Sequence, residues 1–377
     1  MTDREVIVSA SDLAARVIEP SDFVADTEAF VDVRLHRSQG KASYSMIGPG
    51  VSQNPDQSVN LTIPHGFNVG GASMPSGVIN NQHMHFTAEV FICTRGKWRM
   101  NIGEQGGQHL DITEGTVFSV PTWVFRGFEN IGPDDGFLYA LLGGDDTGGI
   151  LWAPHVLEQA AETGLYLDES NGVLDATDGD DVSEAISAVS ADQLNSNVDT
   201  YSDAELTDRA VACEQLEWSN RSLLSAVLPG HECAMAPVIG HGLTEDRHHR
   251  PPITSPHEFS VEWLEVAPGS STGRHRHPGT QVLILVEGSW DIVLNAGDEE
   301  TARPADVGSV VSVPEGAWRD FVNTGDGRSR AIVVCGGNGP TRLEWAPEVT
   351  AAAAGAGWVL DASGYLAPAE LVGSRAI

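Results

Sequence analysis

Two histidines and one carboxylate lie close together in the sequence, in an arrangement that can hold a divalent metal ion. His83 and His85 are two residues apart, and Glu89 follows four residues later. In a β-strand, residues two apart leave the same face, so both imidazoles point in one direction and Glu89 keeps the same parity. Two neutral nitrogens and one anionic oxygen then converge on a metal. A single His-x-His pair is also common on the polar face of a strand, so a second observation is needed.

That observation is an internal repeat. Residues 77–96 contain the two histidines and the glutamate between flanking glycines, and the same frame returns 192 residues later at residues 269–288. The second copy places His275, His277 and Gln281 at the corresponding positions. A metal-ligand spacing that is duplicated together with its glycines favours a built site over a chance pair.

A second motif follows each copy, now 193 residues apart. Residues 115–130 and 308–323 both run from a glycine through a proline and an arginine to an asparagine. Together the two motifs resemble those of the cupin superfamily, G-x5-H-x-H-x3,4-E-x6-G and G-x5-P-x-G-x2-H-x3-N. Because the resemblance covers both halves of the chain, it is a resemblance to the bicupins. It implies an all-β fold of two jelly-roll (cupin) barrels made by internal duplication, with few peripheral helices.

The chain departs from this pattern at several functional positions. The histidine of the second motif is arginine in both copies, Arg126 and Arg319, and the glutamate of the second copy is Gln281. The turn glycine of the first copy is replaced by Trp123. Because a neutral amide oxygen is a weaker ligand than a carboxylate, we expect the second copy to bind metal less well than the first.

The organisation along the chain agrees with a duplicated β-fold. Short runs rich in β-formers alternate with glycine, proline and aspartate clusters, as in antiparallel barrels. The expected boundaries are residues 1–169 for an N-terminal cupin domain, residues 170–201 for an acidic linker, and residues 202–377 for a C-terminal cupin domain. Helix is expected only at residues 11–16 and, after a capping-box spacing, from residue 202 to about residue 216.

Composition limits the possible partners and location. The net charge is −32, and the chain contains only two lysines, Lys41 and Lys97. Such an acidic surface repels nucleic acid. No apolar stretch is long enough to span a membrane, and the N-terminus lacks the order of a secretory signal, so we expect a cytoplasmic protein. The four cysteines have no metal or redox spacing and are expected to be reduced core residues.

The first copy predicts the metal chemistry. His83, His85 and Glu89 match the facial triad of non-heme iron(II) oxygenases, which leaves open positions for substrate and oxygen. Fe(II) is therefore the expected cofactor, although Mn, Ni, Co or Zn can use the same ligands. Arg126 cannot act as a ligand, because its guanidinium stays protonated. It either anchors a substrate carboxylate as a catalytic residue, or pairs with Glu89 or a surface acid; an ion pair with Glu89 could replace the metal.

The resemblance implies a function as well. The nearest class among bicupins contains the ring-cleaving dioxygenases of the gentisate and hydroxynaphthoate kind. This resemblance suggests an Fe(II) dioxygenase that acts on a small carboxylate, which in that class is aromatic. Its partners would be an anionic small molecule and O2, in a homo-oligomer. Two alternatives remain: a non-oxidative metal-dependent lyase, isomerase or hydrolase, and a ligand-binding bicupin without turnover.

Overall fold

The computed structural model describes residues 5–195 and 197–373, which form two compact units. Residues 23–214 make one unit, here called the N-terminal barrel. The described residues up to Asp22 and those from Gln215 onward make the other, here called the C-terminal barrel. Both are built mainly of β-strands, which confirms the predicted all-β class.

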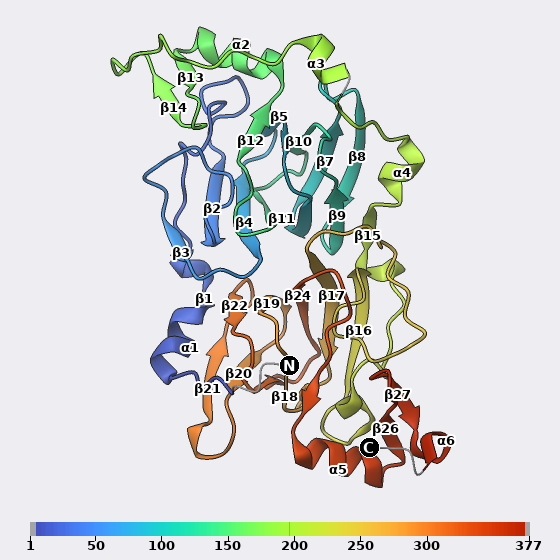
Figure 1. Ribbon diagram of the computed structural model, residues 1–377. Coiled ribbons are helices and arrows are strands. Elements are labelled where there is room, and N and C mark those ends of the chain that lie inside the picture. The colour runs from blue at the N-terminus through green and yellow to red at the C-terminus, as the bar shows by residue number, and fades with distance from the viewer. Residues whose placement is uncertain (1–4, 196, 374–377) are drawn as a thin grey trace. The chain divides into compact units, whose positions relative to one another are not determined.

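The N-terminal barrel consists of two facing sheets. Its strands are β2 (Ala42–Ile47), β3 (Val59–Leu61), β4 (Phe67–Met74), β5 (Ile79–His85), β6 (Glu89–Arg95), β7 (Lys97–Ile102), β8 (Gln108–Thr113), β9 (Thr116–Val120), β10 (Arg126–Asn130), β11 (Gly136–Gly143), β12 (Ile150–Trp152) and β15 (Ala210–Ala212). One sheet has the order β15-β9-β6-β11-β4-β2-β3 and the other β12-β5-β10-β7-β8 (Figure 1). The unit also contains α2 (Pro154–Glu162), α3 (Ala191–Asn195), α4 (Asp203–Thr207), and a hairpin of β13 (Leu165–Leu167) and β14 (Val173–Asp175).

The C-terminal barrel repeats this plan. Its strands are β1 (Val17–Ile18), β16 (Cys233–Ile239), β17 (Phe259–Val266), β18 (His275–Arg276), β19 (Gln281–Glu287), β20 (Trp290–Leu294), β21 (Thr301–Ala305), β22 (Val310–Val313), β23 (Arg319–Asn323), β24 (Ser329–Gly336), β25 (Glu344–Trp345), β26 (Trp358–Leu360) and β27 (Leu366–Pro368). The sheet orders are β1-β22-β19-β24-β17-β16 and β21-β20-β23-β18-β25, with β26 and β27 as a separate hairpin. Its helices are α1 (Ala10–Arg16), α5 (Pro347–Gly355) and α6 (Ala369–Val372). Short 3₁₀ turns occur at Pro20–Asp22, Cys213–Gln215, Leu224–Val227 and Gly297–Glu299.

A helix–strand arm is exchanged between the two repeats. Ser9 caps α1 and Ser202 caps α4, and these serines are 193 residues apart, so the two arms are the same part of the repeat. The α1–β1 arm of the first repeat belongs to the C-terminal barrel, where β1 pairs with β22 (Figure 1). The α4–β15 arm of the second repeat belongs to the N-terminal barrel, where β15 pairs with β9. The units therefore differ from the expected boundaries, because each arm completes a sheet edge of the other repeat.

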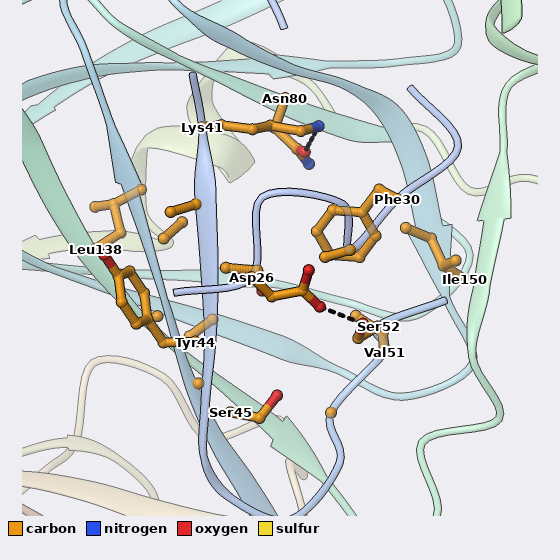
Figure 2. Close-up of a pocket in the computed structure, with 18 of the residues that line it drawn as sticks. Asp26, Phe30, Lys41, Tyr44, Ser45, Val51, Ser52, Asn80, Leu138 and Ile150 are labelled. Atoms are coloured by element: carbon orange, nitrogen blue, oxygen red, sulfur yellow. Dashed lines mark hydrogen bonds between the residues drawn. The ribbon is translucent and has the colours of Figure 1, made fainter. Parts of the chain in front are cut away.

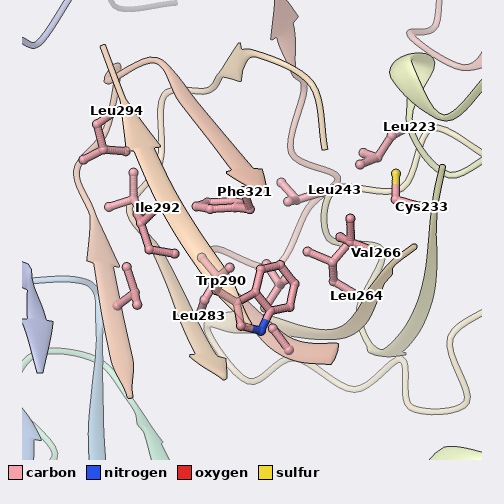
Figure 3. Close-up of a cluster of buried hydrophobic side chains, with 14 of the residues drawn as sticks. Leu223, Cys233, Leu243, Leu264, Val266, Leu283, Trp290, Ile292, Leu294 and Phe321 are labelled. Carbon is pink, nitrogen blue, oxygen red and sulfur yellow. The ribbon is translucent and has the colours of Figure 1, made fainter. Parts of the chain in front are cut away.

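Each barrel encloses its own apolar core. Trp290 and Phe321 lie in the interior of the C-terminal barrel beside Leu283 (Figure 3). Trp98 lies at the corresponding position in the N-terminal barrel and is fully buried. All four cysteines are buried, as expected for reduced core residues. Trp152 is part of the N-terminal core and donates its indole N–H to Gln53.

The helices are only partly those expected from sequence. The capping box of Ser202 and Glu205 is present, but α4 ends at Thr207, and the chain continues into β15 instead of extending the helix to residue 216. Two nine-residue helices, α2 and α5, follow the repeated Trp-Ala-Pro segments and were not expected. No helix among residues 5–195 and 197–373 is long and apolar enough to cross a membrane.

Candidate functional site

The three predicted metal ligands come together in the N-terminal barrel. His83 and His85 end β5 of one sheet, while Glu89 begins β6 of the facing sheet, after a short turn. One ligand atom from each residue lies within 4.8 Å of the others, and all three side chains are buried. The cluster therefore joins the two sheets of the barrel, and Glu89 reaches it from the second sheet rather than by continuing the first strand.

Both imidazoles are held in the form that a metal requires. Nδ1 of His83 lies 2.7 Å from the carbonyl oxygen of Asn81, and Nδ1 of His85 lies 3.1 Å from that of Gly149. A carbonyl can only accept, so each Nδ1 carries the proton and each Nε2 keeps a lone pair. Burial, and then the nearby Arg126 guanidinium, lowers the pKa of His83 to about 3 and that of His85 well below its usual value. Both rings are thus neutral at physiological pH.

Arg126 reaches the same cluster from β10. Its backbone pairs with that of His83, and its side chain is fully buried. Nε donates to Glu89 Oε2 over 3.0 Å, and Nη1 donates to the Val124 carbonyl over 2.9 Å. Nη2 has no hydrogen-bond partner among the described residues. Burial raises the pKa of Glu89, and the guanidinium counteracts this shift. Of the alternatives considered for Arg126, the observed geometry is the ion pair with Glu89.

A small cavity opens from the histidines into the barrel. Its volume is about 70 Å³, and its wall is mostly apolar, with Phe30, Leu138 and Ile150 among the lining residues (Figure 2). Arg126 is not one of the described residues that line it. Trp123 is not either: its ring is 42% exposed and meets the Phe86 ring edge-on, with centroids 5.4 Å apart. Neither departure from the second motif therefore forms the cavity wall.

The polar residues of the cavity wall include a network that sequence reasoning missed. Lys41 precedes β2 and forms a buried ion pair with Asp32, and its Nζ donates to Asn80 Oδ1 over 2.7 Å. Asn80 Nδ2 lies 3.3 Å from His83 Nδ1, which is a contact and not a hydrogen bond, because the Nδ1 proton is donated to the Asn81 carbonyl. The available signal was that Lys41 is one of only two lysines in a strongly acidic chain. This signal did not indicate where Lys41 lies in the fold, because its partners Asp32 and Asn80 are distant in sequence.

Comparisons with known proteins agree with the observed fold. The cupin domain family matches residues 262–335. Among solved structures, oxalate decarboxylase from Bacillus subtilis at pH 4.6 has a TM-score of 0.55 at 14% identity, covering 91% of this chain and 80% of the other. Oxalate decarboxylase of Lactobacillus farciminis in complex with formate also has a TM-score of 0.55, at 13% identity, covering 93% of this chain and 92% of the other. The chain therefore shares the fold of these two structures over most of its length. No curated protein sequence matches it.

In the C-terminal barrel, the corresponding site is occupied by the guanidinium of Arg319. Arg319 Nη1 donates to His277 Nε2 over 2.9 Å and to Gln281 Oε1 over 2.8 Å. Its Nε and Nη2 donate to the carbonyls of Ala317 and Pro314. Burial lowers the pKa of Arg319 to about 9, so it remains charged at neutral pH. The guanidinium therefore occupies two of the three acceptor atoms that a metal would need, those of His277 and Gln281, while Nε2 of His275 accepts no hydrogen bond from the described residues.

The two repeats thus differ in how well their residues suit a metal ion. In the N-terminal barrel, two Nε2 lone pairs and one carboxylate face each other, and these donors suit a divalent ion. The Glu89 carboxylate oxygen also accepts a hydrogen bond from Arg126. Among the described residues, neither His83 nor His85 accepts a hydrogen bond from Arg126. Those residues therefore fit a divalent ion, with Glu89 divided between the ion and Arg126.

Proposed function

We propose that this bicupin is a metal-dependent, non-oxidative enzyme of the lyase kind that acts on a small carboxylate in its N-terminal barrel. His83, His85 and Glu89 would hold the divalent ion. The observation that carries the proposal is the convergence of their ligand atoms within 4.8 Å, beside a cavity of about 70 Å³. When bound, the ion would act as a Lewis acid that polarises an oxygen of the substrate.

The surrounding residues support a role in binding and orientation. The two backbone carbonyls at Asn81 and Gly149 fix the histidine rings, and the contact with Arg126 holds the Glu89 carboxyl group with its Oε2 3.5 Å from His85 Nε2. The apolar wall around Phe30 keeps water away from a bound ligand. A low-dielectric setting strengthens every electrostatic contact with a carboxylate.

The solved structures favour this non-oxidative reading over the Fe(II) dioxygenase expected from sequence. Both oxalate decarboxylases named above catalyse, by name, loss of a carboxyl group, and a further structure of the B. subtilis enzyme, with a TM-score of 0.52 at 15% identity, concerns its Mn(II) centres. Mn was among the metals left open by the sequence. Iron, O2 as a partner and a homo-oligomer remain predictions.

Metal analysis of the purified protein tests the proposal. Wild-type protein and His275→Ala should carry the same amount of a divalent ion, while His83→Ala and Glu89→Gln should lose most of it, by roughly tenfold or more. Incubation with small carboxylates should release CO2 or another cleavage product without net O2 uptake. Iron together with stoichiometric O2 uptake would support the dioxygenase instead. Equal metal loss in His275→Ala would show that the wrong barrel was assigned.

One observation favours a second candidate, a binding protein without turnover. The Arg126–Glu89 ion pair already neutralises the only carboxylate of the cluster. If Arg126→His raises the metal content from near zero, the native arginine excludes the ion, and the N-terminal barrel then serves to bind a ligand only.

A further inference from the structure

The side chain of Lys41 is an unassigned cation on the wall of the N-terminal cavity. It is buried, with 7% of its side chain exposed, and it lines the cavity together with Asn80 and His83. Figure 2 shows Lys41 and Asn80 joined by a hydrogen bond on one part of the wall, while Asp26 and Ser52 are joined on another. Burying a lysine ammonium costs free energy unless the charge is paired and hydrogen-bonded. The contacts of Lys41 therefore show how much of its hydrogen-bonding capacity is left for a ligand.

The contacts of Lys41 leave one N–H free. An ammonium group has three donors, and the described residues offer two acceptors, Asp32 Oδ1 and Asn80 Oδ1. Asp32 is anchored from its other oxygen, which accepts the backbone and side-chain N–H groups of Asn81. The ammonium also lies 5.3 Å from the centroid of the Phe30 ring. The lysine is thus held in place by acceptors on one side, while it faces the cavity with donor capacity to spare.

The cavity limits what can reach that donor. Its volume of about 70 Å³ is well below the roughly 150 Å³ of an engineered apolar cavity that takes up benzene. A ring-bearing acid is therefore too large, whereas an acid with a few heavy atoms fits. Leu138 and Ile150 on the wall offer no polar group. A short acid can place its carboxylate at Lys41 and still reach toward the histidine cluster, since Asn80 contacts both Lys41 and His83.

We propose that Lys41 is the carboxylate-binding residue of the N-terminal cavity and that its ligands are short, non-aromatic carboxylates. The substrate class rests on the proposed function, because that function requires a small acid beside the histidine cluster. The binding step itself does not require the metal. A charge-assisted hydrogen bond from Lys41 fixes the orientation of the acid, with the remaining atoms toward His83 and His85.

The two-lysine composition allows a direct test. Protein labelled with ¹³C and ¹⁵N only in lysine has two sets of side-chain signals, one from Lys41 and one from the exposed Lys97. Titration with acetate, with NaCl at equal ionic strength as the control, should shift the Lys41 ε and ζ signals to saturation and leave those of Lys97 in place. Benzoate should shift neither. The titration is run on chelator-treated protein and again after loading with Zn²⁺.

Variants then separate binding from folding. Lys41→Met should weaken acetate binding by roughly 10- to 100-fold, measured by calorimetry. Because that change leaves Asp32 buried and unpaired, Lys41→Met/Asp32→Asn serves as the second variant, and Lys97→Met is the matched control that should bind acetate normally. No shift of the Lys41 signals in either metal state, or equal shifts of both lysines, overturns the proposal. A saturable Lys41 shift in protein that never takes up metal supports Lys41 as an anion site and rejects the metal-dependent function.

Discussion

The two barrels carry an arginine at the same place and use it differently. In the C-terminal barrel, Arg319 donates from all three of its nitrogens and takes the acceptor atoms of His277 and Gln281. In the N-terminal barrel, Arg126 has a carboxylate to pair with, and its Nη2 meets no acceptor in the part of the chain that the structure describes. The two sites thus differ by one exchange, Glu89 in the N-terminal barrel and Gln281 in the C-terminal barrel. The N-terminal barrel can share its carboxylate between Arg126 and a metal ion, whereas in the C-terminal barrel Arg319 takes the place of the ion.

The interiors differ in the same sense. Gly70 lines the N-terminal cavity, and the matching residue of the second repeat is Glu262, which is fully buried and accepts the Leu243 N–H over 2.7 Å. Lys41 corresponds to Cys233, which is part of the C-terminal core. In the second repeat, buried Glu262 and Cys233 thus take the places of Gly70 and Lys41, which line the cavity of the first repeat.

The largest expected effect comes from removing each arginine in turn. Arg126→Met leaves Glu89 buried without a partner and should cost about 3–5 kcal/mol of unfolding free energy in chelator. Added divalent metal should restore most of it, because the ion then neutralises Glu89. Arg319→Met strands no carboxylate and should cost about 1–3 kcal/mol, with no recovery on adding metal. Urea unfolding with and without metal measures both. Recovery of Arg319→Met by metal would contradict the difference drawn between the barrels.

A second contrast concerns a buried acid and its neutral counterpart. Glu245 accepts the Leu224 backbone N–H and the Trp345 indole N–H, over 2.6 and 2.8 Å. In the first repeat Gln53 accepts from the corresponding backbone and indole groups over 3.0 and 3.1 Å. Burial raises the pKa of Glu245 to about 8. A protonated Glu245 is therefore the close equivalent of Gln53.

This contrast predicts a pH dependence of stability. The pKa of Glu245 in the folded protein, about 8, lies above its unfolded value of about 4.5. The contribution of Glu245 to the unfolding free energy is therefore complete below pH about 4.5 and is lost as the pH rises to about 8. The loss is at most about 1.4 kcal/mol per pH unit. Glu245→Gln should flatten the unfolding free energy over that range. Gln53→Glu should add the same slope to the first repeat. Urea unfolding at a series of pH values measures this, and an unchanged slope in Glu245→Gln would mean that Glu245 is ionised when folded.

Much of the site could be predicted from sequence because its information is local. The spacing of His83, His85 and Glu89, and the arginine in place of a histidine, are visible within two short motifs, and the ion pair of Arg126 with Glu89 was one of the stated alternatives. The network of Lys41 with Asp32 and Asn80 could not be predicted, because nothing local brings these residues together. Tertiary packing alone does so.

The fold shows the same division between local and distant information. Two β-barrels follow from the repeated motifs and from short strands between turn residues. The helices α2 and α5 had a local signal that was not used, a proline at the first helical position after Trp-Ala. The exchanged arms had no such local signal, because α1 and α4 are equivalent segments of the repeat. Which barrel each arm joins depends on the strand pairing in the folded sheets. Boundaries drawn along the sequence therefore differ from those in space.

The smallest expected effect concerns the turn in which Trp123 of the first repeat takes the place of Gly316. Gly316 has φ +72° and its counterpart Trp123 has φ +61°, so the turn keeps its left-handed backbone although a tryptophan replaces the glycine. Left-handed geometry costs a non-glycine residue about 1–2 kcal/mol. The edge contact with Phe86 returns about 0.5–1.5 kcal/mol. Trp123→Gly should therefore change the unfolding free energy by less than about 1 kcal/mol, because the two effects nearly cancel.

The matched change in the second repeat sharpens this test. Gly316→Ala introduces the strain without any ring contact, so it should cost about 1–2 kcal/mol in urea unfolding. Because Trp123 is not among the described residues that line the cavity, Trp123→Gly should also leave metal content and acetate affinity unchanged. A loss of acetate affinity in Trp123→Gly would place the exposed ring over the path into the cavity. The difference between the repeats at this turn would then concern ligand access rather than backbone geometry.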